Sequence, residues 1–207
     1  MLRVFGVLSM VCAAAACAAP PVPVVGEATA SPKDVAFHCP KAGTSVTYND
    51  ADRPVVFTGA DAADPFLCTA RGPNGVRLRR FGNIITAVPG QEAEFREGMT
   101  RLFPLRAGKT VDFGYYRGYV NDPTKRDRHN ETWSVGQSTV LQIGSRTMTV
   151  IPVVQTIETI ASTNTNAWRW KHFYEPGSGV WVRGEPELLR GQVNGLRPYT
   201  ATALTVP

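Results

Sequence analysis

The chain has 207 residues, and this length favours one folded core plus an export segment over two domains. Apolar residues make up 43% of the chain, as in an ordinary globular protein, so a wholly disordered chain is excluded. The formal net charge is only +5 and no nucleic-acid-binding module accompanies it, so we expect no nucleic-acid partner. Nineteen glycines and 16 prolines favour short strands and turns over long helices.

The N-terminus has the pattern of an export signal. Arg3 precedes an apolar run from Val4 to Val11, and small residues follow from Ala13 to Ala19. The apolar run is too short to span a bilayer, which takes about 20 residues. We therefore predict a signal peptide at residues 1–16 and an exported protein.

The cleavage point decides where the mature protein resides. Ala14-Ala15-Ala16-Cys17 resembles a bacterial lipobox, although that pattern usually has Leu where Ala14 stands. Cleavage before Cys17 would leave its thiol to carry a lipid, which predicts a membrane partner and the periplasmic face of the outer membrane. The alternative is ordinary cleavage after Ala16 or Ala18, which predicts a soluble periplasmic protein.

A Pro/Ala-rich segment at residues 17–34 follows. It has too little large apolar content to fold, so we expect a disordered tether. A single β-rich domain is expected at 35–207. It divides into disulfide-clasped hairpins at 35–88, a helix at 91–103 and a meander at 104–207.

Two cysteines remain inside the predicted domain. Cys39 and Cys68 would reach an oxidising compartment, so a disulfide between them is the default expectation. A metal site is the alternative, but neither cysteine has a CxxC partner, and His38 beside Cys39 is a poor chelate without further ligands. We expect no metal and no cofactor.

Short β-branched and aromatic runs predict two hairpins in the first part of the domain. They join residues 45–48 to 54–58 and residues 66–71 to 76–81. After Pro89-Gly90, apolar residues at helical spacing predict one amphipathic helix that ends before Pro104, with Phe95, Met99, Leu102 and Phe103 on its core face.

The remaining chain reads as an antiparallel meander around a basic loop at residues 122–131. The strands are expected at 111–119, 139–143, 147–161, 167–174, 180–182 and 199–206. The predicted fold class is therefore mainly β, with a curved antiparallel sheet of half-barrel or sandwich-like form and one helix.

Three stretches carry a family resemblance. They are FPLRAGKTVDF, TVLQIGSRTMTVIPV and WRWKHFYEPGSGVWVR, between Phe103 and Arg183. Together they resemble uncharacterised bacterial envelope lipoproteins and secreted proteins, and the segment from CPKAGT to DPFLC resembles a module of alphaproteobacterial secreted proteins. The resemblance implies a periplasmic half-barrel-like sheet, sometimes associated with lipid or lipoprotein handling. No catalytic residue comes with it.

Catalytic motifs with a supporting context are missing from the sequence, so we expect a non-catalytic protein. The alternative is an envelope hydrolase that assembles a carboxylate pair from Glu131, Glu158 and Glu175.

One strand carries an alternating aromatic pattern. Trp168, Trp170, His172 and Tyr174 would share one face, while Arg169 and Lys171 point to the other. This face is either a core surface beneath the helix or a wall that accepts an apolar or sugar ligand, with further wall residues at Tyr115 and Tyr119. The sequence thus predicts a binding or structural envelope protein, whose partner is a hydrophobic ligand or another envelope protein.

Overall fold

The computed structural model describes residues 34–49, 53–72, 75–80, 83–84, 92–119, 122–160 and 165–207. Residues 77–80, 83–84, 92, 118–119 and 122–126 are described by their backbone alone. The predicted signal peptide, Cys17 and the tether up to residue 33 lie outside the described residues, as does the side chain of Tyr119.

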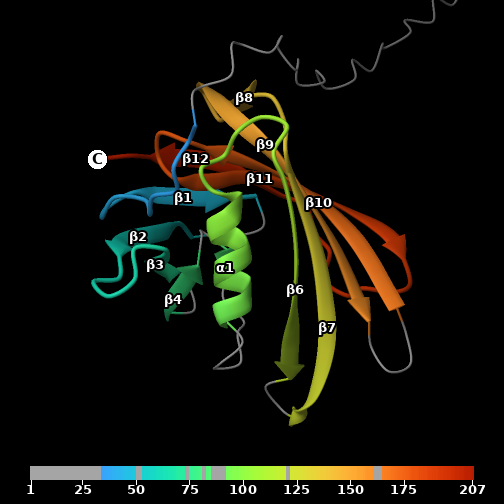
Figure 1. The fold of residues 1–207 in the computed structure, drawn as a ribbon. Coiled ribbons are helices and arrows are strands. Elements are labelled where there is room, and N and C mark those ends of the chain that lie inside the picture. Colours follow the sequence, from blue (N-terminus) through green and yellow to red (C-terminus); the bar gives the residue numbers. More distant parts are fainter. Residues whose placement is uncertain are drawn as a thin grey trace, which may run out of the picture.

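The described part of the chain forms strands and one helix (Figure 1). The helix is α1, Glu92–Leu102. The strands are β1 Ser45–Tyr48, β2 Val55–Ala60, β3 Leu67–Gly72, β4 Gly75–Arg80, β5 Asn83–Ile84, β6 Thr110–Tyr119, β7 Asp122–Val135, β8 Thr139–Ile143, β9 Arg146–Ile160, β10 Thr165–Glu175, β11 Val180–Arg190 and β12 Tyr199–Thr205.

All of these strands belong to one antiparallel sheet. Its order is β5-β4-β3-β2-β1-β12-β11-β10-β9-β7-β6, and β8 pairs with β9 beside this path. The pairing of β1 with β12 joins the N-terminal hairpins to the C-terminal strand. The predicted fold class, a mainly β protein with a curved antiparallel sheet and one helix, is confirmed.

The helix α1 connects the two ends of the open sheet. In Figure 1 the sheet bends so that β2–β4 and β6–β7 lie on either side of α1. On one side Arg96 forms an ion pair with Asp64 at 3.5 Å and lies over the Phe66 ring. On the other side the Phe95 ring packs edge-on against Phe113 of β6, with 5.9 Å between ring centroids. The helix thus holds the sheet in its bent form.

The predicted core face of α1 is confirmed. Met99 and Leu102 are fully buried, and Phe103 just after the helix is 8% exposed. Gly98 allows the close approach to β6, because a Cβ at this position would stand 2.3 Å from the Phe113 ring. Removing these apolar surfaces from water stabilises the contact between the helix and the sheet.

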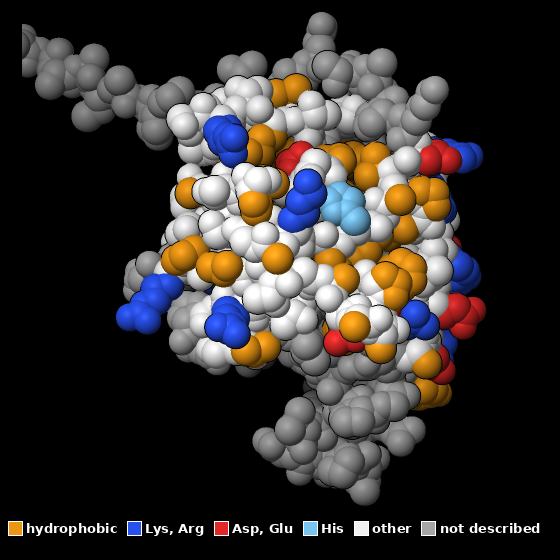
Figure 2. Space-filling model, turned by 90° about the vertical axis from the view of Figure 1, so that its left-hand side faces the viewer, with side chains coloured by type: hydrophobic (Ala, Val, Ile, Leu, Met, Phe, Trp, Pro, Cys, Tyr) orange, Lys and Arg blue, Asp and Glu red, His pale blue; other side chains and the backbone are white. Residues whose placement is uncertain are grey.

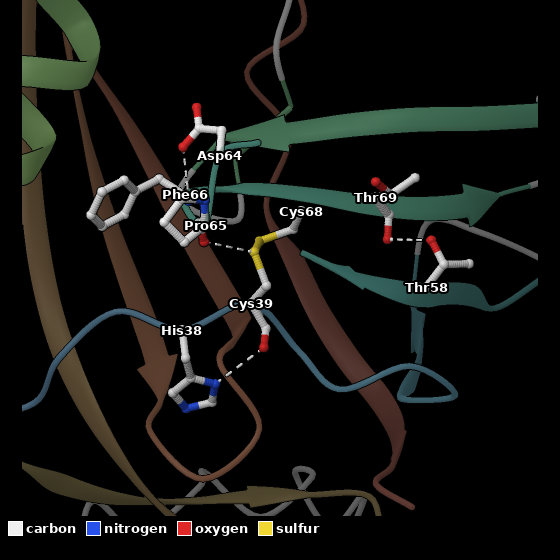
Figure 3. Close-up of a disulfide and its surroundings, with 8 residues drawn as sticks. All are labelled: His38, Cys39, Thr58, Asp64, Pro65, Phe66, Cys68 and Thr69. Atoms are coloured by element: carbon white, nitrogen blue, oxygen red, sulfur yellow. Dashed lines mark hydrogen bonds between the residues drawn. A yellow bond between two sulfur atoms is a disulfide. The ribbon is translucent and has the colours of Figure 1, made fainter. Parts of the chain in front are cut away.

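The predicted disulfide is present (Figure 3). Cys39 is bonded to Cys68 of β3, 29 residues further on, and so fixes the segment before β1 to the second hairpin. Beside it the Phe66 N–H donates to Asp64 at 3.0 Å, which closes the turn before β3. Both predicted hairpins are confirmed, since β1 pairs with β2 and β3 with β4.

The prediction of a basic loop at residues 122–131 is wrong. These residues belong to the 14-residue strand β7, which pairs with β6 on one side and β9 on the other. The strand pattern is hard to recognise because the positions facing the core include polar residues, His129 and Glu131, beside Trp133. Their burial is explained by hydrogen bonds that the sequence does not reveal.

Candidate functional site

The candidate site lies on the inner face of the sheet, meaning the face turned toward α1. Strand register places its side chains in cross-strand rows, because residues opposite one another in antiparallel strands point to the same side. The rows run from β7 through β9 and β10 to β11, and they are Glu131–Ile157–Trp168–Leu188, Trp133–Gln155–Trp170–Pro186 and Val135–Val153–His172–Gly184. Tyr199 of β12 continues the last row beside Gly184.

A buried carboxylate lies at the centre of this face. Glu131 is 3% exposed. Its Oε1 accepts a hydrogen bond from the Tyr115 hydroxyl at 2.8 Å. Its Oε2 accepts one from Trp133 Nε1 at 2.7 Å and one from Gln155 Nε2 at 2.9 Å. Three donors from three strands therefore converge on one carboxyl group, as burial of such a group requires.

The hydrogen bonds continue from Gln155 toward the edge of the face. Because the Gln155 amide nitrogen donates to Glu131, its oxygen is left to accept from His172 Nε2, 3.0 Å away. His172 Nδ1 then accepts from the Tyr199 hydroxyl at 3.1 Å. The acceptor at Glu131 thus sets the tautomer of His172 and the direction of the Tyr199 hydroxyl proton.

Burial dominates the ionisation of these groups. It raises the pKa of Glu131, although the three donated hydrogen bonds act in the opposite direction. Burial lowers the pKa of His172 to about 4, and burial together with the nearby Arg117 lowers the pKa of His129 to about 4. The pKa of Tyr115 is raised by burial and by the negative charge of Glu131. Both histidines are therefore neutral at neutral pH.

Aromatic rings surround this network. Trp170 stacks on His172 with 5.4 Å between ring centroids and an interplanar angle of 11°. The Trp133 ring also stacks on His172, with 5.9 Å between ring centroids. The Tyr199 ring fills the space over Gly184, where a Cβ would stand 2.2 Å from it. The polar network is thus enclosed between rings, which excludes water and strengthens its hydrogen bonds.

Two indoles of the inner face are only half-buried. Trp168 packs edge-on against His129, with 6.3 Å between ring centroids, and Trp170 lies 6.0 Å from the Tyr199 ring. Within the described residues neither indole N–H meets a hydrogen-bond acceptor, whereas that of Trp133 donates to Glu131. Next to them on β11, Pro186 is half-buried and Leu188 is 50% exposed. We name Trp168, Trp170, Pro186 and Leu188 the aromatic wall.

The outer face of the same strands is charged. Arg169 pairs with Glu187 at 3.3 Å, Arg183 pairs with Glu185, and Arg190 pairs with Glu158. Beside the aromatic wall the sheet therefore carries ion pairs on its outer face, whereas Phe173, further along the same face of β10, is buried.

The five predicted ligand-facing residues whose side chains the structure describes have different environments. Trp168, Trp170, His172 and Tyr174 share the inner face, as the alternation predicted, and Arg169 and Lys171 lie on the outer face. Tyr174 is fully buried against Phe103 and Trp181, so it is part of the core. His172 is also buried. Tyr115 is half-buried, and its hydroxyl donates a hydrogen bond to Glu131. Contact with a ligand stays a prediction for Trp168 and Trp170.

Sequence reasoning missed three residues of the site. Gln155 connects Glu131 to His172, Tyr199 ends the network, and Gly184 makes room for the Tyr199 ring. A signal for Gln155 was available, because it is an amide in the otherwise apolar alternation of β9. The sequence gives no comparable signal for Tyr199, since its contact with His172 depends on the pairing of β12 with β11.

The three carboxylates of the hydrolase alternative do not form a pair. Glu131 is buried on the inner face, and Glu158 lies on the outer face beside Arg190. Glu175 accepts hydrogen bonds from the N–H groups of Gly177 and Ser178 in the turn between β10 and β11. Among the described residues, no cluster of three or more His, Cys, Asp or Glu side chains could hold a metal ion.

Comparisons with known proteins give little more. No family model and no curated protein matches the chain. The fold is similar to the crystal structure of the hypothetical lipoprotein YmcC from Escherichia coli (K12), with a TM-score of 0.47 and 11% sequence identity, over 82% of this chain and 88% of that one. A likeness of this size leaves the function to be argued from the chain's own residues. The predicted alphaproteobacterial origin stays a prediction.

In the described part of the chain, no helix has the length and apolar content needed to cross a membrane.

The Glu131 network yields a stability prediction. Replacing Glu131 with Leu leaves the N–H groups of Trp133 and Gln155 without their acceptor, and we expect a loss of about 3 kcal/mol in the free energy of unfolding. Glu131→Gln should cost less than half as much, because its amide oxygen still accepts both hydrogen bonds. Urea denaturation measures both variants. A Leu variant as stable as the unmodified protein would contradict the structural role of the carboxyl group.

His172 yields a pH prediction. Its folded pKa of about 4 lies below the ordinary value of 6.5, so the unfolded chain binds the extra proton first as the pH falls. Its contribution is complete above pH 6.5 and is lost as the pH falls toward 4, on the order of 3 kcal/mol. The raised pKa of Glu131 acts with the opposite sign, favouring the folded state at low pH.

His172→Gln keeps a donor and an acceptor but removes the titration. We therefore expect its stability to fall less between pH 7 and pH 4 than that of the unmodified protein, measured by urea denaturation at each pH. The exposed His38 replaced by Gln is the control. If the free energy of unfolding falls equally with pH in the His172 variant and the unmodified protein, His172 is not the group whose protonation destabilises the fold.

Proposed function

We propose that the protein is a non-catalytic binding module that holds an apolar ligand against the aromatic wall. The observation that carries this proposal is the alignment of Trp168 with Leu188 and of Trp170 with Pro186 on two paired strands, all partly exposed on the inner face. Half-exposed tryptophans on a rigid surface are typical of ligand sites and cost little entropy when a ligand binds.

The dimensions of the wall suit a hydrocarbon. From Trp168 to Trp170 the strand advances two residues, which is about 7 Å, and β10 and β11 lie about 4.8 Å apart. A small ring system or a short stretch of an acyl chain fits such a patch. The ion pairs of these strands lie on the outer face, so a ligand on the wall meets rings and methylene groups.

The two indole N–H groups add polarity to the wall. Since neither has an acceptor among the described residues, each could donate to an oxygen of the ligand. An amphiphile with a hydrocarbon part and a few oxygens would therefore bind better than a pure hydrocarbon, because its oxygens can accept from the indole N–H groups.

The buried carboxyl group supports a role without catalysis. Both oxygens of Glu131 accept hydrogen bonds from neighbouring side chains, and the group is 3% exposed. A general acid or base must reach the substrate, directly or through one water. A hydrolase that uses Glu131, Glu158 and Glu175 is the weaker proposal, because these groups lie on different surfaces.

We place this module in the bacterial envelope as a lipoprotein. The support is the sequence, in which small residues precede Cys17 and a Pro-rich tether follows it. Asp34, the first described residue, forms an ion pair with Arg106.

Mass spectrometry of the intact protein tests the proposed lipid anchor at Cys17. Protein expressed with its own signal in a Gram-negative host should begin at Cys17 and carry a lipid modification, and Cys17→Ser should abolish that added mass. A mature protein that begins at residue 17 or 19 without added mass would refute the anchor and leave a soluble periplasmic protein.

The aromatic wall is tested by binding of a fatty acid that carries a naphthalene fluorophore. Trp168→Ala and Trp170→Ala should each weaken binding by about tenfold, since tryptophans that become buried by a bound partner are frequent hot spots. Arg169→Ala and Lys171→Ala, on the outer face of the same strand, are matched controls and should bind as the unmodified protein does. Equal affinities for all four variants would contradict a site on the inner face.

A further inference from the structure

The aromatic wall is bordered by a tyrosine that its neighbours hold in place. Tyr199 of β12 is half-buried, and its ring lies 6.0 Å from that of Trp170. The ring fills the space over Gly184, and the Tyr48 ring packs edge-on against it, with 5.5 Å between ring centroids. On the side of the molecule shown in Figure 2, by contrast, hydrophobic side chains are scattered among cationic and uncharged ones, as is normal for a protein surface. A ligand that lies on Trp170 therefore has the Tyr199 side chain as its neighbour.

The buried network decides which way the Tyr199 hydroxyl points. An indole N–H can only donate, so the Glu131 oxygen that Trp133 contacts is an acceptor. The Gln155 amide group also donates to this oxygen, and in the reverse orientation it would place one acceptor against another. The Gln155 oxygen therefore accepts from His172 Nε2, which leaves Nδ1 of the neutral ring to accept from Tyr199. The hydroxyl proton of Tyr199 is thus committed to His172.

This direction restricts what a ligand can offer to the wall. A phenol group has one proton to donate, and its oxygen accepts through its lone pairs. With its proton on His172, the Tyr199 oxygen can act toward a ligand only as an acceptor, so a polar group that meets it must be a donor. The indole N–H groups of Trp168 and Trp170 require the opposite, an oxygen that accepts. The wall therefore selects a ligand that carries a donor and an acceptor close together.

We propose that the ligand of the aromatic wall is a neutral amphiphile with a hydroxyl group beside an ester oxygen, of the class of a fatty-acyl ester of a polyol. This ligand class rests on the proposed function, because it describes what the same site would hold. The ligand hydroxyl would donate to Tyr199, and the ester oxygen would accept from the N–H of Trp170. The hydrocarbon part would lie along Trp168 and Leu188, which stand opposite one another on the inner face.

Two simpler amphiphile classes match the wall less well. The carboxylate of a free fatty acid has only acceptor oxygens, so it would place a negative charge against the lone pairs of Tyr199. A pure hydrocarbon would cover the indole N–H groups without giving them an acceptor, which costs free energy. Both would still bind through their hydrocarbon part, but more weakly than a polyol ester with the same chain.

The test is calorimetric titration of the whole mature chain carrying Cys17→Ser, which removes the site of the proposed lipid anchor. The two probes are glycerol mono-octanoate and the same ester with both hydroxyl groups methylated, so they share the chain and the ester oxygens. We expect the first to bind about fivefold more tightly, the effect of one hydrogen bond. Tyr199→Phe should abolish this preference, whereas a preference caused by the bulk of the methyl groups would remain.

His172 acts here as a positioning residue, and its variants separate hydrogen-bond direction from packing. His172→Leu releases the Tyr199 proton, which can then turn toward an ether oxygen of the ligand, so the preference for the hydroxyl probe should be lost. His172→Gln keeps an acceptor for that proton and should keep the preference. The matched control is Tyr48→Phe, because the Tyr48 hydroxyl donates to the Trp181 carbonyl group at 2.9 Å and should have no effect on the preference.

Circular dichroism checks that each variant is folded. The proposed ligand class is overturned if the unmodified protein binds both probes equally, if Tyr199→Phe retains the preference, or if His172→Gln loses it as His172→Leu does. Trp168→Ala should weaken the binding of both probes by the same factor. Equal binding of both probes that Trp168→Ala still weakens would therefore refute the ligand class alone, whereas the absence of any binding would refute the ligand site as well.

Discussion

The arrangement of side chains on the inner face depends on one requirement. The buried carboxyl group of Glu131 must accept hydrogen bonds from neighbouring side chains. Tyr115, Trp133 and Gln155 meet that requirement from β6, β7 and β9. Since an unpaired buried carboxyl group would cost far more than the hydrogen bonds gain, these strands are held in one register. The network stabilises a particular arrangement of the face as well as the fold itself.

The same network explains why part of the face can remain apolar and open. His172 is fixed between Gln155 and Tyr199, and the Trp170 ring rests on it. Because its ring stacks on the fixed His172, Trp170 keeps its orientation although no other element packs over it. It can therefore contact a ligand with little loss of side-chain entropy. The helix covers the other part of the face and connects the two ends of the sheet, which leaves β10 and β11 as the open portion.

Much of the fold could be predicted from residue patterns, and the site could be predicted only in part. The helical spacing of Phe95, Met99 and Leu102 and the alternation from Trp168 to Tyr174 are local signals, and both predicted the correct faces. The strand β7 was missed because buried His129 and Glu131 look like loop residues until their partners are known. Trp133 lies two residues away on the same strand, but Tyr115 and Gln155 come from other strands, and pairing between strands leaves no periodic trace in the sequence.

The most direct test of a ligand site on the aromatic wall is the NMR spectrum of the four tryptophan side chains during titration with dodecanoate. The indole N–H signals of Trp168 and Trp170 should shift with increasing ligand. The signal of Trp133, which is bonded to Glu131, and that of buried Trp181 should stay in place. Four unchanged signals, or four that shift together, would contradict a binding site at the open portion of the inner face.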